Sequence, residues 1–320
     1  MNAKNIILAI LMVLSFAACS SEIEGIDDNM TNTNVNVNNG ETSISVRMMT
    51  EGVDTKAGIP SDELAIRNYV IAVFEEGSKE RVGYAFGGTT GGYLETPIVK
   101  GIDAKAGEVT VIVVANVDDT SVFDNLYTYQ DFTSMTVGNL NNLTKVGIKT
   151  NVTLSATSNS LSITLKQLTS RVNVTLNEPK VSGGSGVTAE LKAYSYSASI
   201  AKNSTVISAP QTGEVSSVEL DENGETSLSY MTYAVKNPEL TVKAQLVIYM
   251  NGEVRQKTEK DIEIKFISKD TGKQLEALIA GESYNQQIDV NVTVSQNFDV
   301  EFGYEIVEIG INENQDITYN

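Results

Sequence analysis

A short alternating segment near the N-terminus is the most informative pattern in this chain. Residues 42–48 read TSISVRM, with Ile44, Val46 and Met48 on one face and mostly polar residues on the other. Alternation with a period of two predicts a half-buried β-strand. The next residues, EGVDTKAG, show no strand pattern and contain two glycines, so they predict a loop that exposes Lys56 to a trypsin-like protease. Removing such a strand from a folded sheet would leave a groove with an unpaired edge on either side.

From Leu64 onward, alternating and apolar runs follow one another. In the first half these runs predict strands over residues 65–74, 108–117, 146–154 and 161–165. The second of them, EVTVIVVANV, is apolar enough to be a central strand with both faces buried. Only residues 123–143 predict short helices, with Asp124 and Thr128 as capping residues.

A second half of the chain begins near Leu168. Residues 168–179 (LTSRVNVTLNEP) predict a strand with one apolar face, formed by Val172, Val174 and Leu176. Asp221–Gly224 and Asn251–Gly252 are turn signals between alternating runs, so both predict β-hairpins.

The C-terminal residues carry two apolar faces in succession. After an alternating run over residues 288–294, a first face comprises Val300, Phe302, Tyr304 and Ile306. The phase then flips, and a second face comprises Val307, Ile309 and Ile311. Such a flip allows a strand to cross from one sheet, or one molecule, to another.

Composition excludes several classes of function. The chain has 320 residues and a net charge of −18, which makes nucleic acid an unsuitable partner because phosphate binding needs clustered Lys and Arg. Histidine is absent, which removes the usual general base and the commonest zinc ligand. We therefore expect no enzyme activity, no metal site and no cofactor.

The first 18 residues have the pattern of an export signal. Lys4 supplies a positive start, residues 6–16 form a short apolar core, and small residues precede the single cysteine, Cys19. The run LSFAAC resembles a bacterial lipobox, which implies cleavage before Cys19 and lipidation of its thiol. The alternative is an ordinary secretory signal with an incidental cysteine. Residues 20–41 are polar and of low complexity, so they predict a tether.

Strands at this spacing, with few helices and five prolines, predict an all-β protein built from β-sandwiches. The length fits two sandwiches in tandem, over residues 57–167 and 168–320. Residues 19–56 would then be a lipidated tether together with the removable first strand.

The order of several motifs resembles the fimbrillins, the type V pilin subunits of Bacteroidia. These motifs are LSFAAC, an ISV-type first strand, a basic residue followed by Ala-Gly, AIRNYVIAVFEEG, VTVIVVANV, QLTSRVNVTL and GESYNQQIDVNVTV. Together they span nearly the whole chain.

The resemblance implies two Greek-key, transthyretin-like β-sandwich domains and export as an outer-membrane lipoprotein. It also implies removal of the first strand by a protease and polymerisation into a fimbria, in which a neighbour's C-terminal segment enters the groove. Carried onto this sequence, the scissile bond is Lys56–Ala57, with Arg47 as the alternative. The family often has Arg at this place. The donor lies among the two C-terminal apolar faces, and the sequence does not choose between them.

Three other functions stay open at this point. The chain resembles accessory subunits as well, which serve as fimbrial anchors, length regulators or adhesive tips with host or bacterial targets. A glycan-binding surface lipoprotein of a nutrient-uptake system is less favoured, because Trp is absent and only Tyr127, Tyr129 and Phe132 offer a cluster of aromatic residues. An enzyme is least favoured, since the sequence shows no nucleophile–base pair.

Overall fold

The computed structural model describes residues 40–50, 64–89, 92–268, 271–295 and 300–312, with side chains in the last range as far as Ile306. Within these ranges β-strand is the dominant secondary structure, which confirms the all-β prediction. The described helices are short: η1 (Thr120–Phe123), α2 (Tyr129–Ser134) and η2 (Leu140–Asn142).

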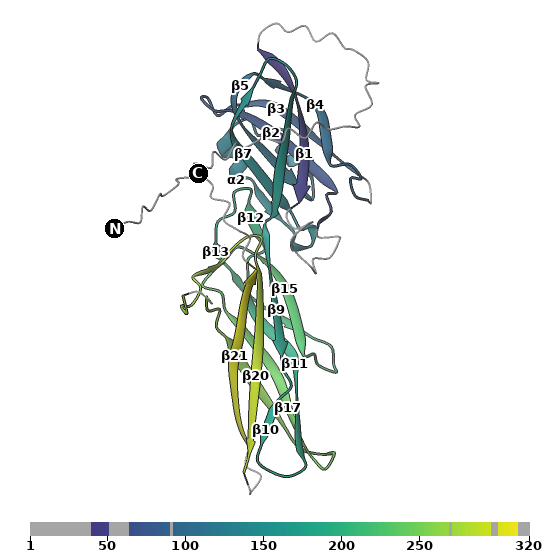
Figure 1. The fold of residues 1–320 in the computed structure, drawn as a ribbon, viewed down its shortest axis with the longest axis vertical. Helices are drawn as coiled ribbons and strands as arrows, with labels where there is room; N and C mark the ends of the chain where they lie inside the picture. The colour runs from purple at the N-terminus through teal and green to yellow at the C-terminus, as the bar shows by residue number, and fades with distance from the viewer. Residues whose placement is uncertain (1–39, 51–63, 90–91, 269–270, 296–299, 313–320) are drawn as a thin grey trace, which may run out of the picture. The chain divides into compact units, whose positions relative to one another are not determined.

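Strands from the first half of the chain form one sheet (Figure 1). Its order is β3 (Arg81–Gly88), β2 (Asn68–Glu75), β5 (Gly107–Ala115), β7 (Lys145–Leu154), β8 (Asn159–Gln167), β1 (Glu41–Thr50) and β4 (Ile98–Lys105). A Cβ atom placed on Gly83 of β3 would lie 2.8 Å from the carbonyl oxygen of Asp103 on β4. The first and last strands of this order therefore lie against each other, so the sheet curls around its own interior.

The apolar strand β5 lies inside this sheet, as its composition predicts. Every residue from Val109 to Ala115 is buried. Val109, Val111 and Val113 belong to an interior cluster shared with β1, whereas Ile112 and Val114 pack with the residues under η1 and α2. Both faces of β5 thus carry a core.

The capping prediction is right for one residue and wrong for the other. The Thr128 hydroxyl accepts a hydrogen bond from the backbone nitrogen of Asp131 at 3.1 Å, and thereby caps α2. Asp124 instead ends η1 with helical dihedral angles, and its carboxylate accepts a hydrogen bond from the hydroxyl of Tyr84. The N-terminal cap of η1 is Asp119, whose extended backbone suits that role.

The second half of the chain forms two larger sheets, one small sheet and one strand of another small sheet. One large sheet contains β10 (Lys180–Ser182), β20 (Ser283–Val294), β9 (Thr169–Leu176), β15 (Ser227–Tyr233) and β21 (Val300–Asn312). The other contains β14 (Glu214–Glu219), β11 (Val187–Ile200), β17 (Leu240–Met250) and β18 (Glu253–Ile264). The small ones are β6 (Thr136–Gly138) with β12 (Asn203–Thr205), and β13 (Gln211–Thr212) with β16 (Val235–Lys236) and β19 (Ala277–Leu278).

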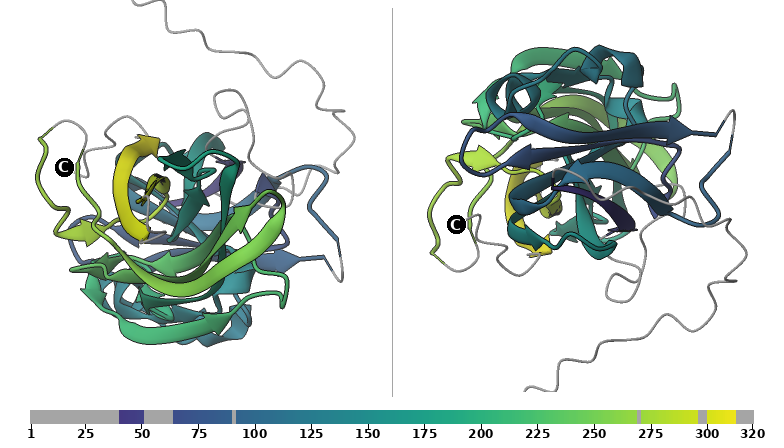
Figure 2. Two further views of the ribbon diagram at one scale, coloured as in Figure 1. Left: turned by 90° about the horizontal axis from the view of Figure 1, so that it is seen from below. Right: turned by 90° about the horizontal axis from the view of Figure 1, so that it is seen from above.

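These two large sheets share a core. Val172, Val242 and Val290 come from both of them and belong to one cluster of buried residues. Seen end-on, the yellow β20–β21 pair faces the green strands of the other sheet (Figure 2). This arrangement is a β-sandwich. The domain boundary between residues 167 and 168 stays a prediction.

The two turn signals of this half have different outcomes. Asn251 and Gly252 have φ angles of 52° and 84° and join β17 to β18, which confirms that hairpin. The Asp221–Gly224 hairpin prediction is wrong, because β14 pairs with β11 whereas β15 pairs with β9. The turn itself forms, since the Gly224 nitrogen donates a hydrogen bond to the carbonyl oxygen of Asp221. It carries the chain from one sheet to the other, because tertiary packing and not the turn decides which strands pair.

A glycine on β7 allows the sheet to bend before β8 reaches β1. The structure pairs β7 with β8 only at Lys145 and Val146. A Cβ atom on Gly147 would lie 2.5 Å from the carbonyl oxygen of Thr164 on β8. Only glycine leaves room for this close crossing.

We expect Gly147→Ala to lower the free energy of unfolding by about 1–3 kcal/mol, because the added methyl group meets backbone that cannot move freely. Gly138→Ala is the matched control, since its Cβ atom would lie 4.0 Å from the nearest neighbour. Urea unfolding of both variants measures the difference. Equal midpoints for the two variants would contradict the close crossing at Gly147.

Candidate assembly site

The first strand, β1, lies inside its sheet. It pairs antiparallel with β4, from Glu41 opposite Lys105 to Arg47 opposite Ile98. It also pairs in parallel with β8 over residues 44–50. In Figure 1, β1 is the purple strand next to β4. Both edges of its backbone are therefore hydrogen-bonded, and its removal would leave β4 and β8 with facing unpaired edges.

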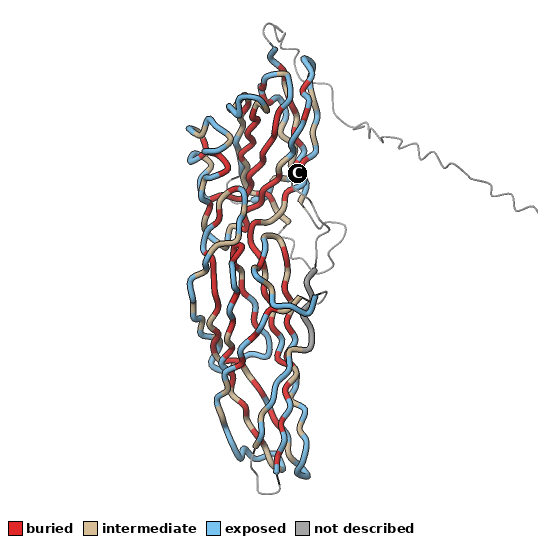
Figure 3. The backbone as a smooth tube through the Cα atoms, turned by 90° about the vertical axis from the view of Figure 1, so that its left-hand side faces the viewer, coloured by how far each residue is buried: buried red, intermediate tan, exposed pale blue. Residues whose placement is uncertain are grey.

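One face of β1 forms part of the core. The relative exposure of Ile44, Val46 and Met48 is 0%, 0% and 2%, and Thr42 is buried beside them. The alternation of buried and open residues along such strands is visible in Figure 3. Burying three large apolar side chains contributes about 5–9 kcal/mol. That is comparable to the whole stability of an ordinary domain.

Polar contacts fix both ends of β1. The Thr42 hydroxyl donates a hydrogen bond to the carbonyl oxygen of Thr157 at 2.6 Å and accepts one from the Asn159 side-chain amide at 2.9 Å. At the other end, the Met48 nitrogen donates to the carbonyl oxygen of Pro97 at 2.8 Å. No pattern in the sequence pointed to the Thr42–Asn159 contact, because the two residues lie far apart along the chain.

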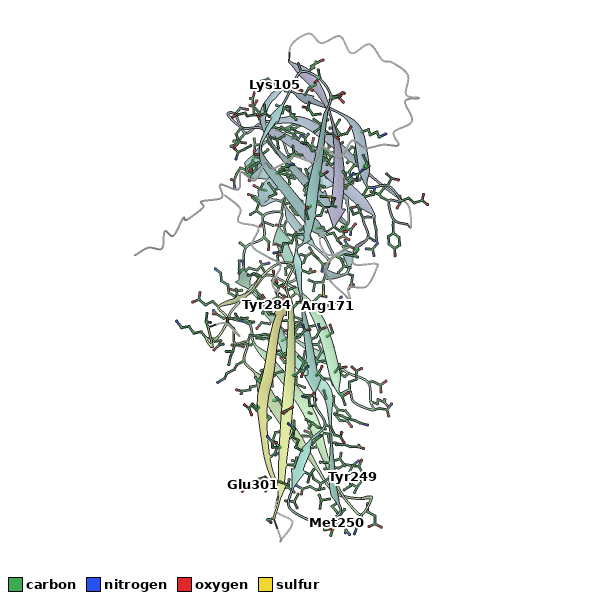
Figure 4. The ribbon with its side chains drawn as sticks, viewed as in Figure 1. Lys105, Arg171, Tyr249, Met250, Tyr284 and Glu301 are labelled. Atoms are coloured by element: carbon green, nitrogen blue, oxygen red, sulfur yellow. The ribbon has the colours of Figure 1, made fainter. Side chains whose placement is uncertain are left out.

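The strand β4 on one side of β1 has two further features. Its register to β1 shifts between Ile102 and Val99, at the position of Gly101, whose φ of +69° suits a β-bulge. At its end, Lys105 (labelled in Figure 4) lies 2.6 Å from a carboxylate oxygen of Glu75. Hydrogen bonds from Lys105 and Ser78 hold the pKa of Glu75 below its ordinary value. This pair is exposed, so it positions β4 more than it stabilises the fold.

The C-terminal strand, β21, lies at the edge of its sheet, in contrast to the inner strand β1. In the described part of the chain it pairs antiparallel with β20 and with no other strand. Figure 4 labels Tyr284 at one end of this pair and Glu301 at the other. Val300, Phe302 and Ile306 are half-buried, and Tyr304 is 38% exposed. None of the side chains from residue 300 to 306 is fully buried, in contrast to β1.

The predicted change of phase is present in β21. Ile306 is opposite Ile288, but the next pair joins Glu308 to Gln287. Val307 is thus the extra residue of a β-bulge. The two C-terminal apolar faces meet at this residue.

The other predicted site residues are placed as follows. Cys19, Lys56 and Ala57 lie outside the described residues. Arg47 lies within β1, where its backbone is part of both ladders. The three aromatic candidates do not form an exposed glycan platform. Phe132 is fully buried, and both Phe132 and Tyr129 pack against the ring of Phe74, whereas Tyr127 is 60% exposed.

The described ranges contain neither a cluster of metal-ligating side chains nor a membrane-spanning helix. No group of three acidic or cysteine side chains there could hold a metal ion. Over the same residues, no helix has the length and apolar character needed to cross a bilayer.

The geometry defines a β-sandwich protein whose first described strand is paired on both edges, and solved structures share its fold. No family model matches the sequence, and no curated protein matches it. A protein of Parabacteroides distasonis, provisionally named a cell adhesion protein, is similar with a TM-score of 0.60 at 17% identity, over 84% of this chain and 97% of the other.

Two similar structures come from Porphyromonas gingivalis. The tip fimbrial protein Mfa3, with a C-terminal truncation, has a TM-score of 0.57 at 12% identity, over 83% of this chain and 99% of the other. The fimbrilin FimA has a TM-score of 0.55 at 13% identity, over 80% and 91%. The chain therefore has the fold of these fimbrial and cell adhesion proteins.

We expect Ile44→Ala to lower the free energy of unfolding of the uncut protein by about 2–5 kcal/mol, because it opens a cavity beside an inner strand. Arg47→Ala is the control from the same strand. Its side chain is exposed, so the expected change is within about 0.5 kcal/mol. Chemical denaturation measures both, and an equal loss in the two variants would contradict the buried face of β1.

Proposed function

We propose that the protein is a structural subunit of a cell-surface fimbria that supports adhesion. It is exported as a lipoprotein through Cys19, cut at Lys56–Ala57, and polymerised by donor-strand exchange. The observation that carries this proposal is the position of β1, an inner strand at the N-terminal end of the described sheet, hydrogen-bonded on both edges. The likeness to fimbrial structures supports it.

The energetics favour exchange once β1 is gone. Its loss exposes the pocket that held Ile44, Val46 and Met48, together with two unpaired strand edges. The donor, β21, occupies an edge position where its described side chains are at most half-buried. Moving into the groove of a neighbour gives it two backbone ladders instead of one. The subunit that accepts it regains its lost core.

The structure favours Lys56 over Arg47 as the site of cleavage. A protease needs an extended backbone that it can pair with, and the backbone of Arg47 is already paired with β4 and β8. A cut at Arg47 would also leave Met48 in the sheet. Cleavage after Lys56 releases all of β1, and Ala57 becomes the first residue of the mature subunit.

Cleavage at this bond joins membrane release to assembly. The lipid on Cys19 holds the precursor in the outer membrane, and the cut separates it from the rest of the chain. Each subunit then accepts one strand and donates another, so contacts run head-to-tail and produce a filament. The partners are other copies of this chain, accessory pilins and the surface protease.

A tip subunit is the second candidate, because Mfa3 is among the similar structures. A tip accepts a strand and has no need to donate one. The long edge strand β21 therefore favours a stalk subunit.

We expect Lys56→Ala to leave a lipid-anchored precursor that retains β1 and forms no fimbriae, because the groove is never opened. The measurement is N-terminal sequencing of surface protein together with electron microscopy of the cells. Wild-type protein should begin at Ala57.

Arg47→Ala serves as the control and should be processed and assembled like the wild type. Fibres built from an unprocessed Lys56→Ala chain would overturn the proposal. Loss of processing in Arg47→Ala but not in Lys56→Ala would show that the protease cuts at Arg47, the alternative site.

A further inference from the structure

The bulge at Val307 divides β21 into two parts with different contacts. We name residues 300–306 the anchor part and residues 307–312 the tail part. In the anchor part, the Tyr304 hydroxyl accepts a hydrogen bond from the backbone nitrogen of Glu263 on β18 at 3.2 Å. The Lys260 ammonium lies 5.0 Å from the ring centre of Phe302. The anchor part is thus tied to the second sheet of its own sandwich as well as to β20.

The strand β20 offers these two parts different surfaces. Opposite the anchor part, its buried residues are Ile288, Val290, Val292 and Val294. Opposite the tail part, the buried residues of β20 are Tyr284 and Gln286. The four aliphatic side chains beside the anchor part are therefore replaced by a phenol and an amide beside the tail part.

Gln286 of β20 is a buried amide without hydrogen-bond partners among the described residues. Its side chain is only 1% exposed, yet its amide nitrogen and oxygen both lack a hydrogen-bond partner within the described structure. A buried amide without partners is penalised relative to the same group in water. Gln286 is opposite Val174 of β9 on one side and Ile309 of the tail part on the other. Departure of the tail part would open one flank of Gln286 to water and relieve the penalty.

The two parts of β21 also differ in how well their apolar side chains match the volume of the side chains that β1 buries. The groove is shaped for an Ile, a Val and a Met at alternate positions, namely Ile44, Val46 and Met48. The tail part offers Val307, Ile309 and Ile311, which have nearly the same total volume. The anchor part would instead insert the aromatic rings of Phe302 and Tyr304, and overpacking of a close-packed site is destabilising.

We propose that the tail part, Val307–Asn312, is the segment received by a neighbouring copy, while the anchor part remains on its own sandwich and Gln286 weakens the hold on the tail. This inference rests on the proposed function, and it selects one of the two C-terminal faces. Ile309, the middle residue of its set, takes the place of Val46 whichever way the strand enters.

Hydrogen exchange on the uncut full chain tests the weak hold without any assembly. We expect amides of residues 307–312 to exchange faster than those of residues 300–306. Gln286→Leu should slow exchange in the tail part by about tenfold, because it removes the unpaired amide. Gln287→Leu is the matched control, since Gln287 is exposed, and should leave exchange unchanged. Equal protection in both parts, or no effect of Gln286→Leu, would overturn the weak hold.

Cross-linking tests which segment enters the groove. Val99 of β4 is opposite Val46, and the cut protein contains no native cysteine because Cys19 is lost with the prosegment. Cut Val99→Cys protein is mixed with cut Ile309→Cys protein, or with cut Tyr304→Cys protein as the matched control, and oxidised. We expect a disulfide-linked dimer with Ile309→Cys and none with Tyr304→Cys.

The outcomes separate this inference from the proposed function. If cut wild-type protein forms no polymer, donor-strand exchange itself is wrong. If it polymerises and only Tyr304→Cys cross-links, exchange stands and the choice of the tail part is wrong. If polymers form and neither variant cross-links to Val99→Cys, Ile309 does not take the place of Val46 and the inference is likewise overturned.

Discussion

The structure depends on the two backbone ladders of β1. This strand lies between β4 and β8, and its apolar face completes the core of the curled sheet. Strands at the edge of a sheet can leave at modest cost, but an inner strand cannot, because both neighbours lose their partners at once. The first strand of the described sheet is thus also one of its most tightly integrated. A protein that sheds such a strand must replace it, which links proteolysis to association.

The opposite end of the chain has the complementary property. β21 has one neighbouring strand, side chains that are at most half-buried over residues 300–306, and an irregularity at Val307. β20 itself is held independently of β21, because it also pairs with β9 and β10. Hydrogen bonds from Lys180 and Asn177 to the carboxylate of Asp289 on β20 keep the pKa of Asp289 below its ordinary value. The sandwich therefore retains its remaining sheet when the tail part of β21 is released. Loss of β1 would destabilise the fold strongly, whereas release of the tail part of β21 would destabilise it little, and strand exchange needs this asymmetry.

The sequence predicted most of the strands, because alternation and apolar runs report burial directly. Ile44, Val46 and Met48 face the core, and the change of phase after Ile306 is a β-bulge. It did not predict which strands pair. The turn at Asp221–Gly224 crosses between sheets, Asp119 takes the capping role expected of Asp124, and the unpaired amide of Gln286 has no signal in the sequence. Each of these depends on residues distant along the chain, which only tertiary packing brings together.

The mixed pairing around β1 has a consequence for polarity. Since β4 runs antiparallel to β1 and β8 runs parallel to it, a replacement strand of either orientation meets one antiparallel neighbour and one parallel neighbour. The main chain alone is thus nearly indifferent to the direction of insertion. The direction of insertion must therefore be set by asymmetric features of the groove. These are the spaces left by the unequal side chains of β1 and the β-bulge of β4 at Gly101. The polarity of a whole fibre would thus depend on a few side chains and on one glycine.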